Sequence, residues 1–275
     1  MSLSEESSEL APFLKWAGGK RWFVKKHLDL LPKKFNTYIE PFIGSGAVFF
    51  KLNPMTAIIN DLNENLMNVY KTIKNNPSDL VHELKKHHSN HSKNYYYYIR
   101  SHQYDDPLEQ AGQFIYLNRT CFNGIYRVNL KGEFNVPIGT KTQVILESDD
   151  FLKISERLAN VKIFNQDFES IIEMAQEGDF IFVDPPYTVS HNNNGFIKYN
   201  ETLFSWNDQV RLYESLKRAH ERHVYFLCTN ANHQSINELY EEEFFSKDIV
   251  SRYSSISGKK SSRNQYEEIV IRNYK

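Results

Sequence analysis

Short apolar runs alternate with amphipathic stretches through much of the chain. Five runs rich in β-branched and aromatic residues end at polar or turn residues, which predicts strands. These runs are residues 38–40, 57–61, 161–164, 180–184 and 224–228. Their apolar positions are nearly continuous, as in the strands of a parallel sheet covered on both faces.

The clearest helical pattern covers residues 207–222. Ser205 or Asn207 can cap its N-terminus, and Asp208 lies in the first turn, where an acid is favoured. One face at helical spacing is predicted to be buried, and it is formed by Val210, Tyr213, Leu216 and His220. Helices between strands predict an α/β fold with a doubly wound sheet.

The alternation is interrupted after the second strand. Helical patterns at 64–74, 78–88 and 108–121 precede a segment rich in Asn and Gly, residues 122–139, that suits a hairpin. An inserted, mostly helical lobe is the simplest account. A final strand is expected at 267–272, paired with one near 244–250.

The 275 residues suffice for one sizeable core and a smaller lobe. Apolar stretches stay well short of the roughly twenty residues of a membrane helix, and the polar, acidic N-terminus is unlike a signal peptide. Cys121 and Cys228 are the only cysteines. Two thiols so far apart in the sequence form no disulfide framework, so we expect a reducing, cytoplasmic location and no membrane association.

The net charge is −1, yet three stretches are basic. Residues 12–34 hold seven basic residues and one acidic residue, and residues 85–131 hold seven and three. Residues 251–266 hold four basic residues and no acidic one. The stretches can converge into one phosphate-binding surface, although three ordinary solvated surfaces would give the same pattern.

A strand at residues 38–40 runs into a turn with Gly44 and Gly46, and a helical pattern follows. Such glycines permit a tight turn and a close approach of the backbone to a ligand. Asp61 ends the next strand, where α/β folds place the acid that binds ribose hydroxyls. The pattern does not distinguish a dinucleotide from S-adenosylmethionine. Residues 13–20 lack features of a phosphate-binding P-loop, among them a hydroxyl residue after Lys20.

Asp184, Pro185, Pro186 and Tyr187 follow a fully apolar strand, at the sheet end where α/β folds bind ligands. The prolines remove two amide donors and leave carbonyl acceptors beside a carboxylate and an aromatic ring. This set fits a planar amino group such as adenine N6. Asp184 and the Pro185 carbonyl can accept its two N–H bonds, free its lone pair and stabilise the developing positive charge. Tyr187 can stack on the base, which must leave the duplex to be reached. A strand-ending turn capped by Asp184 is the structural alternative.

In their order these motifs resemble the Dam-like DNA adenine-N6 methyltransferases of the D12 class, alpha group, over nearly the whole chain. Six ordered matches are more specific than any single one. The matching segments are LKWAGGK at 14–20, EPFIGSG at 40–46, ND at 60–61, NRTCFNGIYRVN at 118–129 with GEFNVP at 132–137, DF at 167–168, and DPPY at 184–187. Downstream, the substrate-side loop is matched by Phe196, Tyr199, Phe204 and Gln209.

The resemblance implies a Rossmann-like S-adenosylmethionine-dependent methyltransferase core at 1–63 and 151–275, with an inserted, mostly helical target-recognition domain at 64–150. It implies catalysis at Asp184, Pro185 and Tyr187. Cofactor contacts with S-adenosylmethionine are expected at Trp16, Lys20, Glu40, Phe42, Gly44, Gly46, Asp61, Asp167, Phe168 and Asp184.

The resemblance also implies double-stranded DNA as partner, GATC as the usual target, and Arg127 in contact with a guanine edge. DNA contacts are expected at Asn123, Arg127, Pro137, Arg252, Lys259, Lys260 and Arg263. Family members often carry an arginine where Ser254 stands, so a phosphate contact is missing there or comes from Arg252. We expect a monomer, with a restriction endonuclease as a candidate partner.

Other features suggest no separate chemistry. His82, His87, His88 and His91 lack a completing carboxylate or cysteine, so a solvated helix face is favoured over a metal site. The tyrosine run 95–98 suits packing of the inserted lobe better than base stacking, and Cys121 suits a packed thiol.

Two rival functions stay open. Cytosine-N4 methylation needs the same pocket, although such enzymes more often carry serine where Asp184 stands. A sequence-specific DNA-binding protein without turnover is the alternative outside the enzymes, and the intact Asp184 and Tyr187 argue against it.

Overall fold

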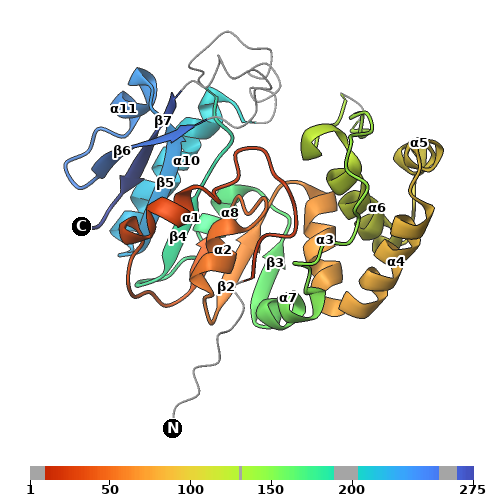
Figure 1. Cartoon of the computed structure of the whole chain (residues 1–275). Helices are drawn as coiled ribbons and strands as arrows, with labels where there is room; N and C mark the ends of the chain where they lie inside the picture. Colours follow the sequence, from red (N-terminus) through yellow and green to blue (C-terminus); the bar gives the residue numbers. More distant parts are fainter. Residues whose placement is uncertain (1–9, 130–131, 189–203, 254–264) are drawn as a thin grey trace. The chain divides into compact units, whose positions relative to one another are not determined.

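The computed structural model describes residues 10–129, 132–188, 204–253 and 265–275 (Figure 1). By its internal contacts the chain divides into two compact units. The first comprises Met1–Val24, Gly44–Asn53 and Asn63–Asn165, and the second comprises Lys25–Ile43, Pro54–Leu62 and Gln166–Lys275. The functional boundaries at 64 and 150 stay a prediction.

The second unit is built on a largely parallel sheet. Its six strands lie in the order β2-β1-β4-β5-β7-β6. They are β1 (Tyr38–Glu40), β2 (Ala57–Asn60), β4 (Phe180–Val183), β5 (Tyr225–Ala231), β6 (Ser246–Tyr253) and β7 (Gln265–Arg272). The described residues contain one further strand, β3 (Val161–Phe164), in the first unit. The predicted α/β class is thereby confirmed.

The strand register aligns the carboxyl ends of the central strands. β1 pairs in parallel with both β2 and β4, with Ile39 opposite Ile58 on one side and Ile181 on the other. Every residue of these three strands is buried. This explains the continuous apolar runs, because a strand covered on both faces has no solvated side on which polar residues alternate.

The last two strands are antiparallel to their neighbours. β7 lies between β5 and β6, with Thr229 opposite Val270 and Ile249 opposite Ile269. The predicted final strand and its pairing with the segment near residue 250 are confirmed. β7 also places Glu268 opposite Ala231 of β5, next to the segment that follows β4.

Three helices of the second unit accompany the sheet: α8 (Phe168–Ile172), α10 (Trp206–Glu221) and α11 (Gln234–Leu239). Ser205 caps α10 in a capping box, in which its side chain accepts from Asp208 N and the Asp208 carboxylate accepts from Ser205 N. The buried face agrees with the predicted one only in part, because Leu216 is buried and Val210 is not. Val210 is exposed, whereas Gln209 is buried and its Oε1 accepts from Asn230 Nδ2 at 3.0 Å. A polar side chain can be buried where a hydrogen bond offsets part of the cost of removing it from water.

The first unit is mainly helical. Its longer helices are α3 (Glu64–Asn75), α4 (Pro77–Asn90), α5 (Lys93–Ser101), α6 (Pro107–Thr120) and α7 (Phe151–Leu158). α6 packs against α3, α4 and α5. Shorter helices are α2 (Ala47–Leu52) and η2 (Phe122–Gly124), while α1 (Phe23–Lys26) crosses into the second unit and η1 (Leu28–Leu30) follows it there.

Side-chain caps explain where these helices begin. Asn63 accepts from Leu66 N, and Asp106 accepts from Leu108 N and Glu109 N ahead of a proline at the first helical position. Ser92 caps α5 through Tyr95 N at 3.2 Å. The hydrophobic pattern alone did not predict α5, because its tyrosine run carries no helical alternation.

The prediction of a solvated histidine face is wrong for His87, which is fully buried in α4. Its ring stacks on Tyr116 of α6 at 4.9 Å, and its Nδ1 lies 2.9 Å from the Tyr95 hydroxyl. Burial lowers the pKa of His87 from 6.5 to about 4.

Cys121 is buried as predicted, and burial raises the pKa of its thiol to about 11, which makes it a poor nucleophile.

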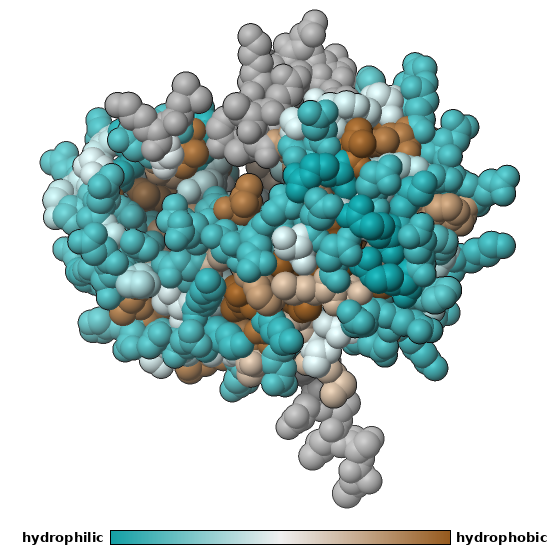
Figure 2. All heavy atoms as spheres, turned by 180° about the vertical axis from the view of Figure 1, so that it is seen from behind, coloured by the Kyte–Doolittle hydropathy of each residue, from teal (hydrophilic) through white to brown (hydrophobic). Residues whose placement is uncertain are grey.

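On the face shown in Figure 2, hydrophilic side chains cover most of the described surface, and apolar ones lie in separate patches. Within the described ranges, no helix combines the length and the apolar character that crossing a membrane requires.

Candidate active site

Three carboxylates belong to the carboxyl edge of the sheet in the second unit. Glu40 is the last residue of β1, Asp61 follows β2 and Asp184 follows β4. Since β2, β1 and β4 are adjacent and parallel, their carboxyl ends share one edge. Glu40 is buried, and its Oε2 accepts a hydrogen bond from the Tyr38 hydroxyl at 2.7 Å. This is the edge at which open α/β sheets bind their ligands.

The carboxylate of Asp184 is held from the neighbouring strand. Thr229 Oγ1 of β5 donates to Asp184 Oδ1 at 2.8 Å, and Thr229 itself is fully buried. The strand register puts Cys228 opposite Val183, which places Thr229 beside the residue that follows β4. Asp184 is half-buried and Pro185 is buried. The predicted catalytic motif therefore leaves the sheet with the carboxylate of its acid held by a hydrogen bond.

Tyr187 is anchored at its hydroxyl. This group donates to Glu268 Oε2 at 2.8 Å, and Glu268 is 2% exposed on β7. The residue as a whole is half-buried, so Tyr187 is fixed at its hydroxyl and keeps part of its surface accessible. Sequence analysis missed both Thr229 and Glu268. The available signal was a polar residue inside an apolar strand, which is buried only at a cost unless it has a partner.

Asn60 joins three of the predicted motifs within the second unit. Its Nδ2 donates to Pro41 O and to Gln166 O, each at 3.0 Å, and its Oδ1 accepts from Gln166 N at 2.8 Å. Its backbone carbonyl accepts from Ile43 N at 2.8 Å. The side chain is 1% exposed. Asn60 thus fixes the segment before Asp167 relative to the segment after β1, a role that the sequence did not reveal.

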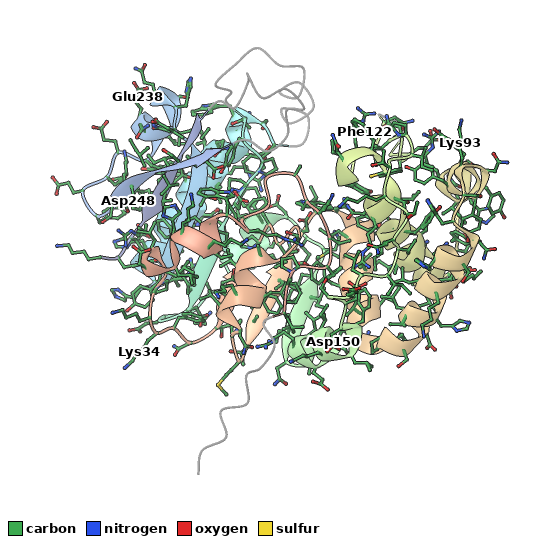
Figure 3. All side chains as sticks on the ribbon, in the orientation of Figure 1. Lys34, Lys93, Phe122, Asp150, Glu238 and Asp248 are labelled. Atoms are coloured by element: carbon green, nitrogen blue, oxygen red, sulfur yellow. The ribbon has the colours of Figure 1, made fainter. Side chains whose placement is uncertain are left out.

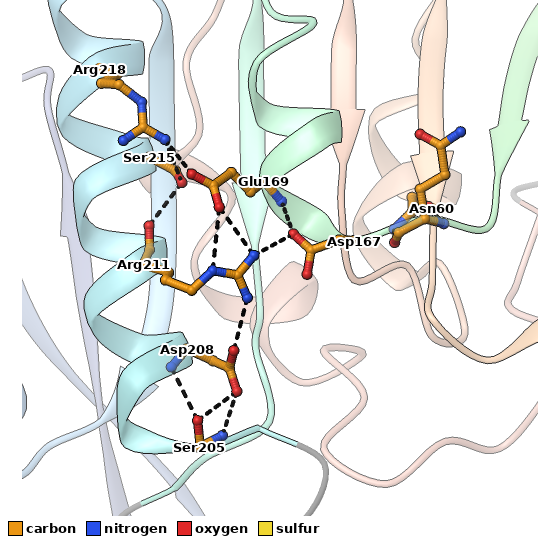
Figure 4. A network of polar contacts seen from close by, with 9 residues as sticks. Asn60, Asp167, Glu169, Ser205, Asp208, Arg211, Ser215 and Arg218 are labelled. Atoms are coloured by element: carbon orange, nitrogen blue, oxygen red, sulfur yellow. Dashed lines mark hydrogen bonds and ion pairs between the residues drawn. The ribbon is translucent and has the colours of Figure 1, made fainter.

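Asp167 and Phe168 open helix α8. Asp167 Oδ1 accepts from Glu169 N at 3.0 Å as the N-terminal cap and from Arg211 Nη2 at 2.7 Å (Figure 4). The Phe168 ring is buried, with centroid distances of 5.5 Å to Phe42 and to Phe204. The predicted cofactor residues Phe42, Asp167 and Phe168 are therefore neighbours, and Phe204 joins them.

In the first unit, the segment around Trp16 is tied to α6. Lys15 N donates to Asn118 Oδ1 at 3.1 Å, and Asn118 Nδ2 returns a bond to Lys15 O at 2.9 Å. The Trp16 ring stacks with Tyr126 at 5.5 Å and with Phe114 at 6.3 Å. Lys20 is 3% exposed, and its Nζ donates to Gly18 O at 3.3 Å.

The glycine turn packs closely against this segment. At Gly44, where φ is +47°, an added Cβ would lie 2.6 Å from Trp16 Cδ1. At Gly46, where φ is +69°, it would lie 2.9 Å from the Tyr70 hydroxyl, which donates to Gly44 O at 3.0 Å. A side chain at either position would meet both a strained backbone and a neighbouring ring, so glycine is required for steric reasons.

The predicted recognition segment is a paired loop in the first unit. Isolated antiparallel bridges join Cys121 to Ile138 and Val128 to Phe134, which confirms the expected hairpin character. Phe122 is 53% exposed (Figure 3), and its N–H donates to Pro137 O at 2.9 Å.

Asn123 adopts a left-handed conformation two residues after the bridge at Cys121, with φ of 57°. Asn123, Arg127 and Pro137 are all exposed, and Arg127 Nε donates to Asn135 Oδ1 at 2.8 Å. The structure therefore brings these three predicted DNA-binding residues into one accessible element. Phe122 was not predicted as a site residue, although an exposed aromatic ring in such a loop is a recognisable signal.

Other predicted residues cannot be placed. Lys259, Lys260 and Arg263 lie outside the described residues, as do Phe196 and Tyr199. For Arg252 only the backbone is described, in β6 opposite Tyr266. Across the described ranges, no group of three or more His, Cys, Asp or Glu side chains is arranged to hold a metal ion.

Comparison with known proteins gives one family. The model of the D12 class N6 adenine-specific DNA methyltransferases matches residues 16–255. Type II methyltransferase M1.LlaDCHI of Lactococcus lactis subsp. cremoris is 39% identical over 281 residues, which cover 99% of this chain and 98% of the relative. Type II methyltransferase M.MjaIII of Methanocaldococcus jannaschii is 36% identical, over 97% and 100% of the two chains. The DNA adenine methylase of Haemophilus influenzae is 31% identical, over 94% and 92%.

Proposed function

Because the chain belongs to the D12 class N6 adenine-specific DNA methyltransferases, we propose that it transfers the methyl group of S-adenosylmethionine to N6 of an adenine flipped out of duplex DNA. Asp184, Pro185 and Tyr187 are the residues that act on the base. S-adenosylmethionine, when bound, supplies an electrophilic methyl group on a sulfonium sulfur.

One observation carries the proposal above the others: Asp184 leaves a buried parallel strand with its carboxylate held by Thr229 at 2.8 Å. A carboxylate and the Pro185 carbonyl are two fixed acceptors for the two N–H groups of an exocyclic amine. Acceptors that are already oriented stabilise the positive charge developing on N6 without reorganising. The half-buried Tyr187 ring, anchored through Glu268, offers a face on which the flipped base stacks.

The residues of each unit suit a nucleoside that carries a cationic sulfur. In the second unit, Glu40, Asp61 and Asp184 give the carboxyl edge of the sheet negative charge, which favours ribose hydroxyls and a sulfonium. Phe168 suits the aromatic ring of adenine, and Asp167 suits its amino group. In the first unit, the close approach of Gly44 to Trp16 leaves no room for a side chain at that position of the turn. We assign the cofactor contacts to these residues and to Lys20, Phe42 and Gly46.

The exposed loop of the first unit supplies the contacts with DNA. Arg127 has the fork of donors that binds guanine O6 and N7 in the major groove, and the exposed Phe122 ring can wedge between base pairs. Asn123 and Pro137 flank the same surface. We propose GATC as the target and a monomer as the active species. Two of the relatives are named type II methyltransferases, and we propose that class here, with a restriction endonuclease as the functional counterpart.

Incubation with methyl-labelled S-adenosylmethionine and unmethylated duplex DNA, followed by digestion to nucleosides, tests the proposal. The expected product is N6-methyl-2′-deoxyadenosine, and duplexes that contain GATC should yield more of it than duplexes that lack GATC. N4-methylcytosine would move the activity to the related exocyclic amine. DNA binding without incorporation of label would indicate a binding protein that has lost turnover.

A further inference from the structure

Arg211 of α10 connects the start of α8 with the start of its own helix. Its Nη2 donates to Asp167 Oδ1 at 2.7 Å and to Glu169 Oε2 at 3.0 Å, and its Nη1 donates to Asp208 Oδ1 at 2.9 Å (Figure 4). The guanidinium carbon lies 4.9 Å from the centroid of the Phe168 ring, over its face. One side chain thus contacts both residues assigned to the adenine end of the cofactor.

The Asp167 carboxylate has one oxygen engaged and one available. Oδ1 accepts from Arg211 and from Glu169 N. Among the described residues, no group donates to Oδ2, and the side chain is 44% exposed. Two bonds to one oxygen fix the plane of a carboxylate, so the direction of the second oxygen is set before any ligand arrives. An oriented acceptor loses less conformational entropy on binding than a mobile one.

Charge keeps the cluster assembled. Burial by itself would lower the pKa of Arg211, but hydrogen bonds to Glu169 and Asp167 raise it above its ordinary value. The hydrogen bond from Arg211 is the largest influence that lowers the pKa of Glu169. Arg211 and Glu169 are therefore both charged near neutral pH.

Docking of the two helices does not by itself require Arg211. Arg218, two turns further along α10, donates to Glu169 Oε1 at 2.7 Å and to Glu173 Oε1 at 2.7 Å. Arg222 adds a bond to Glu173 Oε2 at 2.7 Å. Among these three arginines, Arg211 alone contacts Asp167 and Phe168.

We propose that Arg211 is a positioning residue for cofactor recognition: it holds Asp167 so that Oδ2 accepts a hydrogen bond from the 6-amino group of the adenine, and it covers one face of Phe168. The inference rests on the proposed use of S-adenosylmethionine. It adds that selectivity for an amino group at this end of the ligand depends on a residue that does not touch the ligand.

Equilibrium calorimetry with two ligands tests the inference without turnover. S-adenosylhomocysteine carries the 6-amino group, and S-inosylhomocysteine carries a 6-oxo group in its place. A hydrogen bond to a charged acceptor gives roughly tenfold or greater discrimination. We expect the wild type to prefer the amino ligand by about that factor. In Arg211→Gln the affinities for the two ligands should differ by no more than about threefold.

Arg218→Gln is the matched control, since it removes ion pairs between the same helices without touching Asp167. It should keep the wild-type preference. Arg211→Lys keeps the charge without the planar fork, so it should recover only part of the preference. Thermal unfolding of each variant checks that the fold is intact.

Each contrary result has a distinct meaning. An unchanged preference in Arg211→Gln, or equal weakening of both ligands, would overturn the inference. Asp167→Ser keeps a cap for α8 but removes the carboxylate, and a preference retained in that variant would overturn the proposed Asp167 contact together with the inference. Loss in Asp167→Ser with retention in Arg211→Gln would overturn the inference alone. Failure of the wild type to bind either ligand would count against the proposed cofactor itself.

Discussion

Buried polar side chains on the strands support the residues to which we assign the chemistry. Thr229 holds Asp184, Glu268 holds Tyr187, and Asn60 joins the segments around Pro41 and Gln166. Each supporting side chain is at most 2% exposed. Buried polar groups are costly unless they are satisfied, so their presence in otherwise apolar strands marks positions where geometry matters.

Substitutions of Tyr187 can separate the contribution of its aromatic ring from that of its hydroxyl group. Tyr187→Ala should lower kcat/KM by a factor equivalent to about 1–3 kcal/mol of transition-state stabilisation, the stacking energy of one base. Tyr187→Phe keeps the ring and removes only the bond to Glu268, so its loss should be smaller. Steady-state kinetics on one duplex measures both. Equal losses in the two variants would assign the role to the hydroxyl instead of the ring.

Arg127 is exposed on the predicted recognition segment, and its guanidinium has the donor geometry for guanine. Arg127→Ala should relax discrimination at one guanine of the target by about 1–3 kcal/mol, while other positions keep theirs. Methylation of duplexes with single base substitutions measures this. Uniform weakening on all duplexes would make Arg127 a phosphate contact.

The sequence revealed the residues to which we assign the chemistry and not those that support them. Asp184 and Tyr187 are recognisable because their chemistry and spacing form a motif after a strand. Thr229 lies 45 residues from Asp184 and Glu268 lies 81 residues from Tyr187, and only strand pairing brings each pair together. Arg211 could not be inferred for the same reason, since its link to Asp167 depends on how α10 lies on α8.

Elements were predicted well where one physical rule dominated. Strands buried on both faces gave continuous apolar runs, and Ser205 with Asp208 marked the start of α10. Prediction failed in the first unit, where polar and aromatic side chains are buried against one another through hydrogen bonds and ring stacking. Helix α5 and the burial of His87 depend on contacts among Tyr95, His87 and Tyr116, and these cannot be read from hydrophobic periodicity.

Helix α4 should make stability depend on pH through His87. The pKa of His87 is about 4 in the fold and 6.5 ordinarily, so between these values the unfolded chain binds a proton that the folded chain does not. The free energy of unfolding therefore keeps its full value above about pH 6.5, and it decreases as the pH drops towards 4. From pH 7.5 to pH 5 the loss should be about 2 kcal/mol.

Urea unfolding of the wild type and of His87→Gln at both pH values measures this loss. The variant cannot take up the proton, so its stability should change less between the two conditions. His82→Gln on the same helix is the control and should behave as the wild type does. If His87→Gln loses as much stability as the wild type, another group is responsible.

For the whole molecule, the distribution of charge matters more than its sum. The net charge is −1, yet residues 251–266 carry four basic residues and no acid. If this stretch contacts phosphates, Lys259→Ala with Lys260→Ala should reduce the slope of log Kobs against log salt by about 2. Fluorescence anisotropy on one duplex over a salt series gives the slope. A slope equal to that of the wild type would exclude these lysines from the interface.

The central claim is that the Asp184 carboxylate activates the adenine amine and is not merely part of the surface that binds DNA. Single-turnover methylation by Asp184→Ala, with the affinity for the same duplex measured in parallel, tests it most directly. We predict that N6-methyladenine formation is abolished while DNA binding stays within a few-fold of the wild type. Methylation at a rate close to that of the wild type would contradict the account.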